Sequence, residues 1–111
     1  MSTPQLLFKN RRHGETVFME GYKASGGYSA LEKALTKSSP EEIRNLVKES
    51  GLRGRGGAGF PTGFKWNFFP ADKPGPKYLV CNCDEMEPGT YKDGVLLAAD
   101  PHQLVEGMII S

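Results

Sequence analysis

The stretch GLRGRGGAGFPTGFK, residues Gly51–Lys65, decides the fold, because six of its fifteen residues are glycine. We expect no regular element inside so dense a run, since glycine loses more backbone freedom on folding than any other residue. Positions without side chains also let main-chain N–H groups approach a flat or charged ligand. The segment therefore predicts a loop suited to hold a ligand.

Two well-known phosphate-binding loops do not fit this stretch. Gly54, Gly56 and Gly59 satisfy G-x-G-x-x-G, but that motif requires a strand before it and a helix after it. Here a helical pattern precedes the loop, and Pro61 obstructs a helix that would continue through it. Lys65 has neither the preceding glycine nor the following Ser or Thr of a P-loop.

Two other interpretations of the loop stay open from its residues alone. Arg53 and Arg55 alternate with glycines, as in a flexible basic linker or in an arginine–glycine patch that binds nucleic acid. Both leave Phe60, Phe64 and Trp66 exposed beside the loop unless a ligand or a partner covers them. The formal net charge of +1 also gives no basic surplus for a polyanion.

A helix is expected directly before the loop. Ser39 is a good N-cap, Pro40 suits the first helical position, and Glu42 stands where a capping-box carboxylate belongs. Gly51 supplies the stop. The predicted buried stripe is formed by Ile43, Leu46 and Val47.

The chain before this helix is expected to contain one shorter helix. Helical spacing of apolar residues predicts a helix over Ser29–Lys37, after a turn at Gly26 and Gly27. Met1–Ala24 is expected to be irregular. Within it, Leu6–Phe8 is either a short strand or an arm that packs on a partner.

A strand and an acidic loop are expected after the glycine segment. Tyr78–Cys81 has the pattern of a buried strand, and Asn82–Gly89 forms the following loop. Ligands of open α/β sheets bind outside the carboxyl ends of strands, where carboxylates accept hydrogen bonds from ribose or ring groups. The alternative that stays open is a solvated acidic turn. The candidate polar residues are Asn82, Asp84, Glu85 and Glu87.

The last predicted element is a helix that begins after Asp100, an N-cap followed by Pro101, with Gln103 in the capping-box position. Its expected apolar face comprises Leu104, Val105, Met108 and Ile109. This pattern is still running at Ser111, so the sequence predicts that the domain continues further.

The two cysteines, Cys81 and Cys83, indicate neither a disulfide framework nor a metal knuckle. Two are too few for a disulfide scaffold, and close neighbours rarely meet bridge geometry. Their one-residue gap is shorter than that of zinc or iron–sulfur knuckles. The pattern favours structural thiols on the same side of a strand, and no metal site is predicted.

Length and composition set the outer limits. The 111 residues suit one small domain. No apolar run approaches the roughly 18 residues of a membrane span, and the N-terminus lacks a secretory layout. A cytosolic or matrix-like location is expected.

Three stretches together resemble one family. Gly51–Trp66 (GLRGRGGAGFPTGFKW) resembles the glycine-rich signature of the NADH- and FMN-binding flavoprotein subunit of respiratory complex I, the NADH:quinone oxidoreductase. Cys81–Asp93 (CNCDEMEPGTYKD) resembles the second signature of that family, and Pro101–Ile110 (PHQLVEGMII) continues the match. Gly26–Leu35 matches more loosely. NAD-linked formate dehydrogenases and hydrogenases carry similar subunits, and a stand-alone nucleotide-binding module without catalysis is a further alternative.

The resemblance implies an α/β fold: an incomplete Rossmann-like FMN-binding domain with a glycine-rich loop, N-terminal helices and a short parallel sheet. Residues 1–25 would be an N-terminal arm, and residues 26–111 the N-terminal part of the FMN/NADH-binding domain, truncated at its C-terminus. NADH would stack on FMN and pass it a hydride. Since the cofactors carry that chemistry, no catalytic side chain is assigned.

The resemblance also implies roles for particular residues. Lys65 would be the cation near FMN, Glu87 would lie on the NADH side, and Phe60 and Phe68 would sandwich the adenine. FMN would be contacted by Asn82, Asp84 and Glu85. The nucleotide loop would be lined by Gly54, Arg55, Gly56, Gly57, Ala58 and Gly59.

Two positions depart from the family pattern. Cys83 stands where alanine is usual, which places a thiol near a redox ring. Gly94 stands where arginine is usual, so a charge that could anchor the acidic loop is missing.

The partners implied are a thioredoxin-like [2Fe–2S] subunit and the large iron–sulfur subunit of the same complex, and no nucleic acid. A [4Fe–4S] cluster would belong to the C-terminal part that this sequence lacks. The protein would be cytoplasmic, peripheral on the inner face of the cell membrane through the complex, or on the matrix side in mitochondria.

Overall fold

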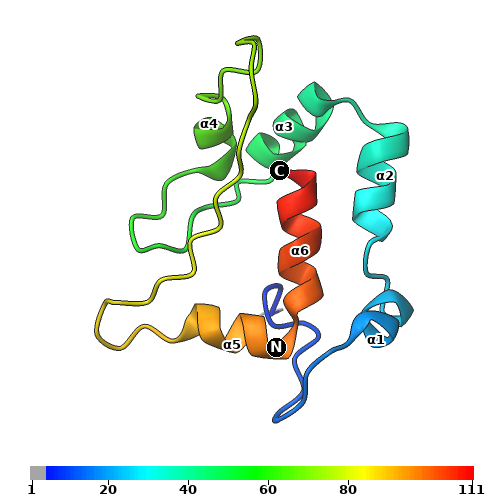
Figure 1. Cartoon of the computed structure of the whole chain (residues 1–111), viewed down its shortest axis with the longest axis vertical. Coiled ribbons are helices and arrows are strands. Elements are labelled where there is room, and N and C mark those ends of the chain that lie inside the picture. Colours follow the sequence, from blue (N-terminus) through cyan, green and yellow to red (C-terminus); the bar gives the residue numbers. More distant parts are fainter. Residues whose placement is uncertain (1–4) are drawn as a thin grey trace. The chain divides into compact units, whose positions relative to one another are not determined.

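The computed structural model describes residues 5–111, and all of its regular elements are α-helices. The chain divides into two units, one that joins the residues up to Glu32 with Tyr78–Ser111, and one that comprises Lys33–Lys77. The helices, labelled in Figure 1, are α1 (Met19–Ala24), α2 (Ser29–Lys37), α3 (Pro40–Glu49), α4 (Thr62–Trp66), α5 (Lys92–Ala99) and α6 (Pro101–Ile110).

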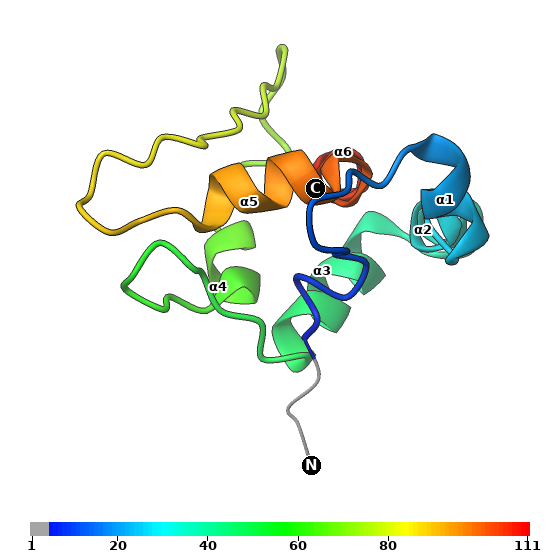
Figure 2. The ribbon, with the colours of Figure 1, turned by 90° about the horizontal axis from the view of Figure 1, so that it is seen from below.

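In the Lys33–Lys77 unit, α3 packs on α4, and Figure 2 shows the two helices side by side. The predicted capping box of α3 is confirmed. The Ser39 hydroxyl accepts from the Glu42 N–H at 3.2 Å, and the Glu42 carboxylate accepts from the Ser39 N–H at 2.8 Å. Gly51 ends the helix region with a φ of 69°, which glycine adopts without strain.

A glycine sets how closely these two helices approach. Gly63 of α4 is buried, and a Cβ built on it would lie 2.3 Å from the Lys48 Cα and 2.7 Å from the Lys48 N. No side chain fits in that space, because the obstructing atoms belong to the backbone. Lys48 also holds its ammonium 5.0 Å from the centre of the Phe64 ring, a cation–π contact across the same pair of helices.

In the other unit, α6 packs against α1 and α5. Helices α5 and α6 meet at Asp100, where the chain turns a corner that is visible in Figure 1. The Val17 N–H donates to the Ala99 carbonyl at 2.8 Å, and the Thr16 hydroxyl donates to the Ala98 carbonyl at 2.7 Å. These two bonds connect the segment before α1 to the end of α5.

The predicted parallel sheet is not confirmed. Residues 5–111 contain no strand, and their one β-type pairing is an isolated antiparallel bridge between Arg53 and Pro61. The buried strand predicted over Tyr78–Cys81 is wrong, because this segment lacks a ladder partner and exposes 82% of Tyr78 and 84% of Val80. An apolar run becomes a buried strand only where another segment pairs with it and covers it.

Three local predictions differ from the structure. Met1–Ala24, expected to be irregular, contains α1. Of the two alternatives for Leu6–Phe8, the strand is wrong, because this stretch leads into a turn in which the Arg11 N–H donates to the Phe8 carbonyl at 3.0 Å. Residues 1–4 of the predicted arm lie outside the described residues. The glycine-rich stretch was expected to hold no helix, yet α4 starts directly after Pro61, where proline imposes no cost on the helix that follows.

The predicted helix Ser29–Lys37 and the predicted start of a helix after Asp100 are confirmed, but the capping box at Asp100 is wrong. Asp100 caps no N–H with its side chain and instead accepts from the Asn10 amide at 2.8 Å. A contact with a distant residue has displaced the local one, which sequence spacing cannot reveal.

The predicted apolar faces are only partly right. Leu46, Val105 and Ile109 are exposed, whereas the acidic Glu106 is buried in α6. Helical periodicity shows which residues share a face of a helix but not how deeply that face is buried.

Among residues 5–111, no helix is both long enough and apolar enough to cross a membrane.

Candidate functional site

The glycine-rich loop is closed like a hairpin. The Thr62 N–H donates to the Leu52 carbonyl and the Gly54 N–H to the Phe60 carbonyl, both at 2.9 Å. The Arg53 guanidinium donates across the base of the loop to the Gly59 carbonyl at 3.0 Å. These bonds make residues 54–60 a defined, solvent-exposed loop.

The tip of this loop presents five consecutive N–H groups with no hydrogen-bond partner among the described residues. They belong to Arg55, Gly56, Gly57, Ala58 and Gly59. Successive free N–H groups form a concave donor surface that binds phosphate or carboxylate oxygens. The nucleotide loop itself stays a prediction.

Positive φ angles shape that tip. Gly57 has a φ of 113° and Gly59 a φ of 64°, values that L side chains rarely adopt. A Cβ on Gly56, Gly57 or Gly59 would meet no atom within 4 Å. Glycine is therefore required at 57 and 59 by backbone conformation and not by crowding.

Two positive charges border the free N–H groups. The Arg55 guanidinium donates to the Arg53 carbonyl at 3.0 Å, and neither arginine forms an ion pair among residues 5–111. Uncompensated guanidinium groups beside free amides favour an anionic ligand.

The remaining predicted residues of this unit lie on the surface. Lys65 is in the last turn of α4, and Phe60 and Phe68 are both exposed, Phe68 by 77%. No ring contact joins Phe60 to Phe68 among the described residues. Both rings are accessible, and the sandwich around adenine stays a prediction.

The acidic loop belongs to the other unit, so it is described separately from the glycine loop. The Asn82 side-chain carbonyl accepts from the Asp84 N–H at 2.9 Å, which makes a local turn. Asp84 and Glu87 are exposed, and their carboxylates have no hydrogen-bond partner in the part of the chain that is described. Both carboxylates are thus available to an incoming ligand.

Glu85 has a role that the sequence did not indicate. Its carboxylate accepts from the N–H groups of Asp93 and Gly94, the latter at 3.2 Å, at the start of α5. A carboxylate there satisfies free amide donors and lies at the positive end of the helix. The acidic loop is therefore anchored through backbone groups, and the absence of an arginine side chain at position 94 does not remove this anchor.

Replacing Glu85 by alanine is expected to lower the free energy of unfolding by about 1–2 kcal/mol, the usual loss for a helix cap. Urea unfolding followed by circular dichroism measures the change. The matched control is Glu87→Ala in the same loop, which removes an exposed carboxylate without such bonds and should change stability by less than about 0.5 kcal/mol. Equal losses in both variants would contradict the capping role.

The two thiols lie close together, although the strand whose side they were expected to share is not formed. Their sulfur atoms lie 3.4 Å apart, and no disulfide joins them. The hydrogen bond with Cys81, together with desolvation, raises the pKa of the Cys83 thiol. They are not buried structural thiols, because Cys81 is exposed and Cys83 partly so. Among residues 5–111, no group of three or more metal-binding side chains comes together.

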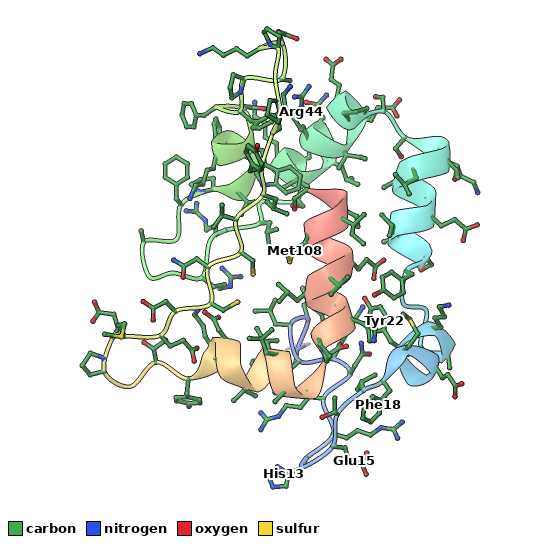
Figure 3. The ribbon with its side chains drawn as sticks, in the orientation of Figure 1. His13, Glu15, Phe18, Tyr22, Arg44 and Met108 are labelled. Carbon is green, nitrogen blue, oxygen red and sulfur yellow. The ribbon has the colours of Figure 1, made fainter. Side chains whose placement is uncertain are left out.

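A buried polar cluster, which the sequence did not indicate, holds α6 in place. The Glu106 carboxylate accepts from the Tyr22 hydroxyl, from the Tyr28 N–H at 3.0 Å and from the Leu31 N–H at 3.1 Å. In Figure 3 the labelled Tyr22 reaches from α1 toward α6. The Tyr28 hydroxyl meets the His102 Nδ1 at 2.7 Å.

The hydrogen bonds in this cluster affect the pKa of Glu106 more than desolvation does. Burial by itself raises the pKa of Glu106, but the donors from Tyr22, Tyr28 and Leu31 lower it by more, so the net shift is downward. Burial and the bond to the Glu106 carboxylate raise the pKa of Tyr22 well above its ordinary value. Glu106 is therefore an ionised, structural carboxylate, and its donors come from residues too distant in sequence to predict.

Known proteins resemble this chain over nearly its whole length. A family model described as the Nuo51 FMN-binding domain matches residues 47–111. An NADH-quinone oxidoreductase subunit of Rhizobium meliloti is 62% identical over 106 residues, which cover 96% of this chain and 25% of that protein. An NADH-quinone oxidoreductase subunit of Escherichia coli is 52% identical over 110 residues, 98% of this chain and 25% of the relative.

The corresponding NADH-quinone oxidoreductase subunit of Aquifex aeolicus is 53% identical over 110 residues, with 99% of this chain and 25% of the relative covered. The chain thus spans about a quarter of the length of the curated relatives that it matches. More than half of it matches the family model, and that match includes both the glycine loop and the acidic loop. The chain belongs to the family of the Nuo51 FMN-binding domain.

Proposed function

We propose that this chain contributes to the FMN and NADH site of an NADH-quinone oxidoreductase, in which NADH gives a hydride to the flavin. The observation that carries the proposal is the row of five free N–H groups at Arg55–Gly59, within the stretch that the FMN-binding family model matches. These donors fit the phosphate groups that both cofactors carry.

The protein's own residues bind and orient in this proposal. The loop amides, with the guanidinium of Arg55, hold phosphate oxygens, and Lys65 adds a cation near the flavin. Phe60 and Phe68 offer flat faces to the adenine of NADH. FMN, when bound, supplies the ring that accepts the hydride, so no nucleophilic side chain is needed.

The acidic loop has two parts in the proposed site. The exposed carboxylates of Asp84 and Glu87 accept hydrogen bonds from ribose or ring groups, Glu87 on the NADH side. Asn82 keeps its amide donors free, since its carbonyl is used in the local turn. Glu85 holds the loop on α5 through two N–H groups, and its oxygens retain further lone pairs for the predicted contact with FMN.

The names of the relatives favour a quinone-linked complex over a formate dehydrogenase or a hydrogenase, because each is called an NADH-quinone oxidoreductase subunit. We propose the thioredoxin-like [2Fe–2S] subunit and the large iron–sulfur subunit as partners. Electrons would pass through iron–sulfur clusters to quinone, the [4Fe–4S] cluster being held outside this chain. The location proposed is cytoplasmic and peripheral at the membrane, through the complex.

Replacing Gly57 by alanine is expected to weaken FMN binding about tenfold, because a side chain at a φ of 113° costs about 1–2 kcal/mol and displaces the loop amides. A suitable host is the Escherichia coli relative in which residues 47–111 of this chain replace the matching stretch. Retained flavin and NADH-dependent ferricyanide reduction are the two readouts.

Gly56→Ala is the matched control, since Gly56 has an ordinary φ and open space around it. This variant should keep both flavin and activity. The proposal would be contradicted if the parent hybrid folded without binding FMN, or if Gly57→Ala retained FMN as tightly as Gly56→Ala.

A further inference from the structure

Cys81 and Cys83 form a pair of thiols that the proposed hydride transfer does not use. Their sulfurs are 3.4 Å apart on an exposed segment, in the reduced state, and the chain contains no other cysteine. We propose that they form a chelating dithiol site, which binds a soft, thiophilic centre through both sulfurs at once. The ligand class is the monosubstituted trivalent arsenical.

The distance between the sulfurs favours a bridging centre over a disulfide. A disulfide needs an S–S distance of about 2.05 Å, and a loop closed by two cysteines with one residue between them is strained, which makes such a bond easily reduced. With bonds to sulfur of about 2.3 Å, the length of thiolate–zinc bonds, two sulfurs 3.4 Å apart enclose an angle of about 95° at the bridging atom.

This angle discriminates between classes of soft ligand. A two-coordinate cation with linear geometry would need sulfurs about 4.6 Å apart at the same bond length. A tetrahedral ion needs four ligands, and no group of three or more metal-binding side chains is present among residues 5–111. A trivalent arsenical bonded to one carbon is pyramidal, with bond angles near a right angle, and requires only two sulfurs from the protein.

The binding reaction is a balanced exchange without electron transfer. Phenylarsine oxide reacts with the two thiols so that two As–S bonds form, the As–O bond is lost, and the arsenical oxygen leaves as water with both thiol protons. Arsenic stays trivalent, so no oxidant is needed. Once the first As–S bond exists, the second sulfur is already in reach, and closure is intramolecular.

The test is a titration of the reduced full chain with phenylarsine oxide, followed by intact mass and by the number of thiols that still react with a disulfide reagent. We expect one arsenical per chain and a fall from two reactive thiols to none. Cys81→Ser and Cys83→Ala should each weaken binding by at least about 100-fold, the gain that chelation provides.

A peptide comprising residues 78–90 contains the same two thiols without the rest of the fold. Comparing it with the full chain shows how much of the affinity comes from the folded structure and how much from the spacing of the cysteines in the sequence. In the folded chain the Glu85 carboxylate, two residues after Cys83, is fixed by the N–H groups of Asp93 and Gly94, which residues 78–90 lack. The chain should therefore bind phenylarsine oxide at least about tenfold more tightly than the peptide. Equal affinity of chain and peptide, or of the chain and its Cys83→Ala variant, would overturn the proposal. FMN binding does not enter this readout, so its outcome is independent of the proposed function.

Discussion

Replacing Gly63 by alanine is expected to lower the free energy of unfolding by about 3 kcal/mol, the upper end of the range for overpacking. A Cβ at this position would lie 2.3 Å from the Lys48 Cα, and the obstructing atoms belong to the backbone of α3. Side-chain rotation therefore gives no relief, and α3 and α4 must move apart. Urea unfolding followed by circular dichroism measures the loss.

Gly107→Ala is the matched control for Gly63→Ala, because Gly107 is also a helical glycine but a Cβ there meets nothing within 4 Å. Removing glycine from open helix surface stabilises by about 0.5–1 kcal/mol. The two identical substitutions should thus change stability in opposite directions. A neutral or stabilising effect of Gly63→Ala would show that α3 and α4 leave room for a methyl group between them.

Replacing Glu106 by glutamine is expected to lower the free energy of unfolding at pH 7 by about 2–3 kcal/mol. The carboxylate accepts three hydrogen bonds, from the Tyr22 hydroxyl and from the N–H groups of Tyr28 and Leu31. Glutamine offers one acceptor oxygen and turns an NH₂ group toward at least one of these donors. Loss of hydrogen bonds to a buried charge has about this magnitude.

The pH dependence of stability identifies this carboxylate independently. Because folding lowers the pKa of Glu106, the stability it contributes is fully present above the unfolded-state pKa of about 4.3 and is lost as pH falls through the lower folded-state pKa. The difference between the parent chain and Glu106→Gln should therefore shrink as the pH falls below about 4.

Tyr22 adds the opposite dependence at alkaline pH. Folding raises the pKa of Tyr22, so the stability that Tyr22 contributes is fully present below the unfolded-state pKa of about 10 and is lost as pH rises through the higher folded-state pKa.

Glu49→Gln, an exposed change on α3, is the control for Glu106→Gln and should alter stability by less than about 0.5 kcal/mol. A constant difference between the parent chain and Glu106→Gln from pH 7 to pH 3 would disprove the proposed role of Glu106.

Much of the candidate site could be predicted from the sequence, because its donors are backbone amides. The density of glycine predicted a loop without a regular element over Gly51–Lys65, which is wrong at its end, where α4 begins, while the free N–H groups lie in the loop before it. The resemblance then supplied the ligand class, which glycine density leaves open. The specific contacts of Phe60, Phe68 and the acidic residues stay predictions.

The sequence alone determined the features that depend on neighbouring residues. The capping box of Ser39 and Glu42, the stop at Gly51 and the bounds of α2 each rest on residues a few positions apart. Such contacts form within one turn of chain, so residue spacing specifies them. The family was equally accessible, because its two signatures are continuous stretches.

Only the tertiary structure decided the features that join distant residues. Glu106 can be buried because it accepts hydrogen bonds from residues that lie 75 to 84 positions before it in the sequence. Glycine is needed at position 63 because the backbone of Lys48, in another helix, occupies the space that a Cβ would fill. Tyr78–Cys81 had the composition of a strand but has no pairing partner among the described residues, so it lies outside any strand and is exposed. Burial and pairing depend on which segments meet in space, and no local pattern of residue types records that.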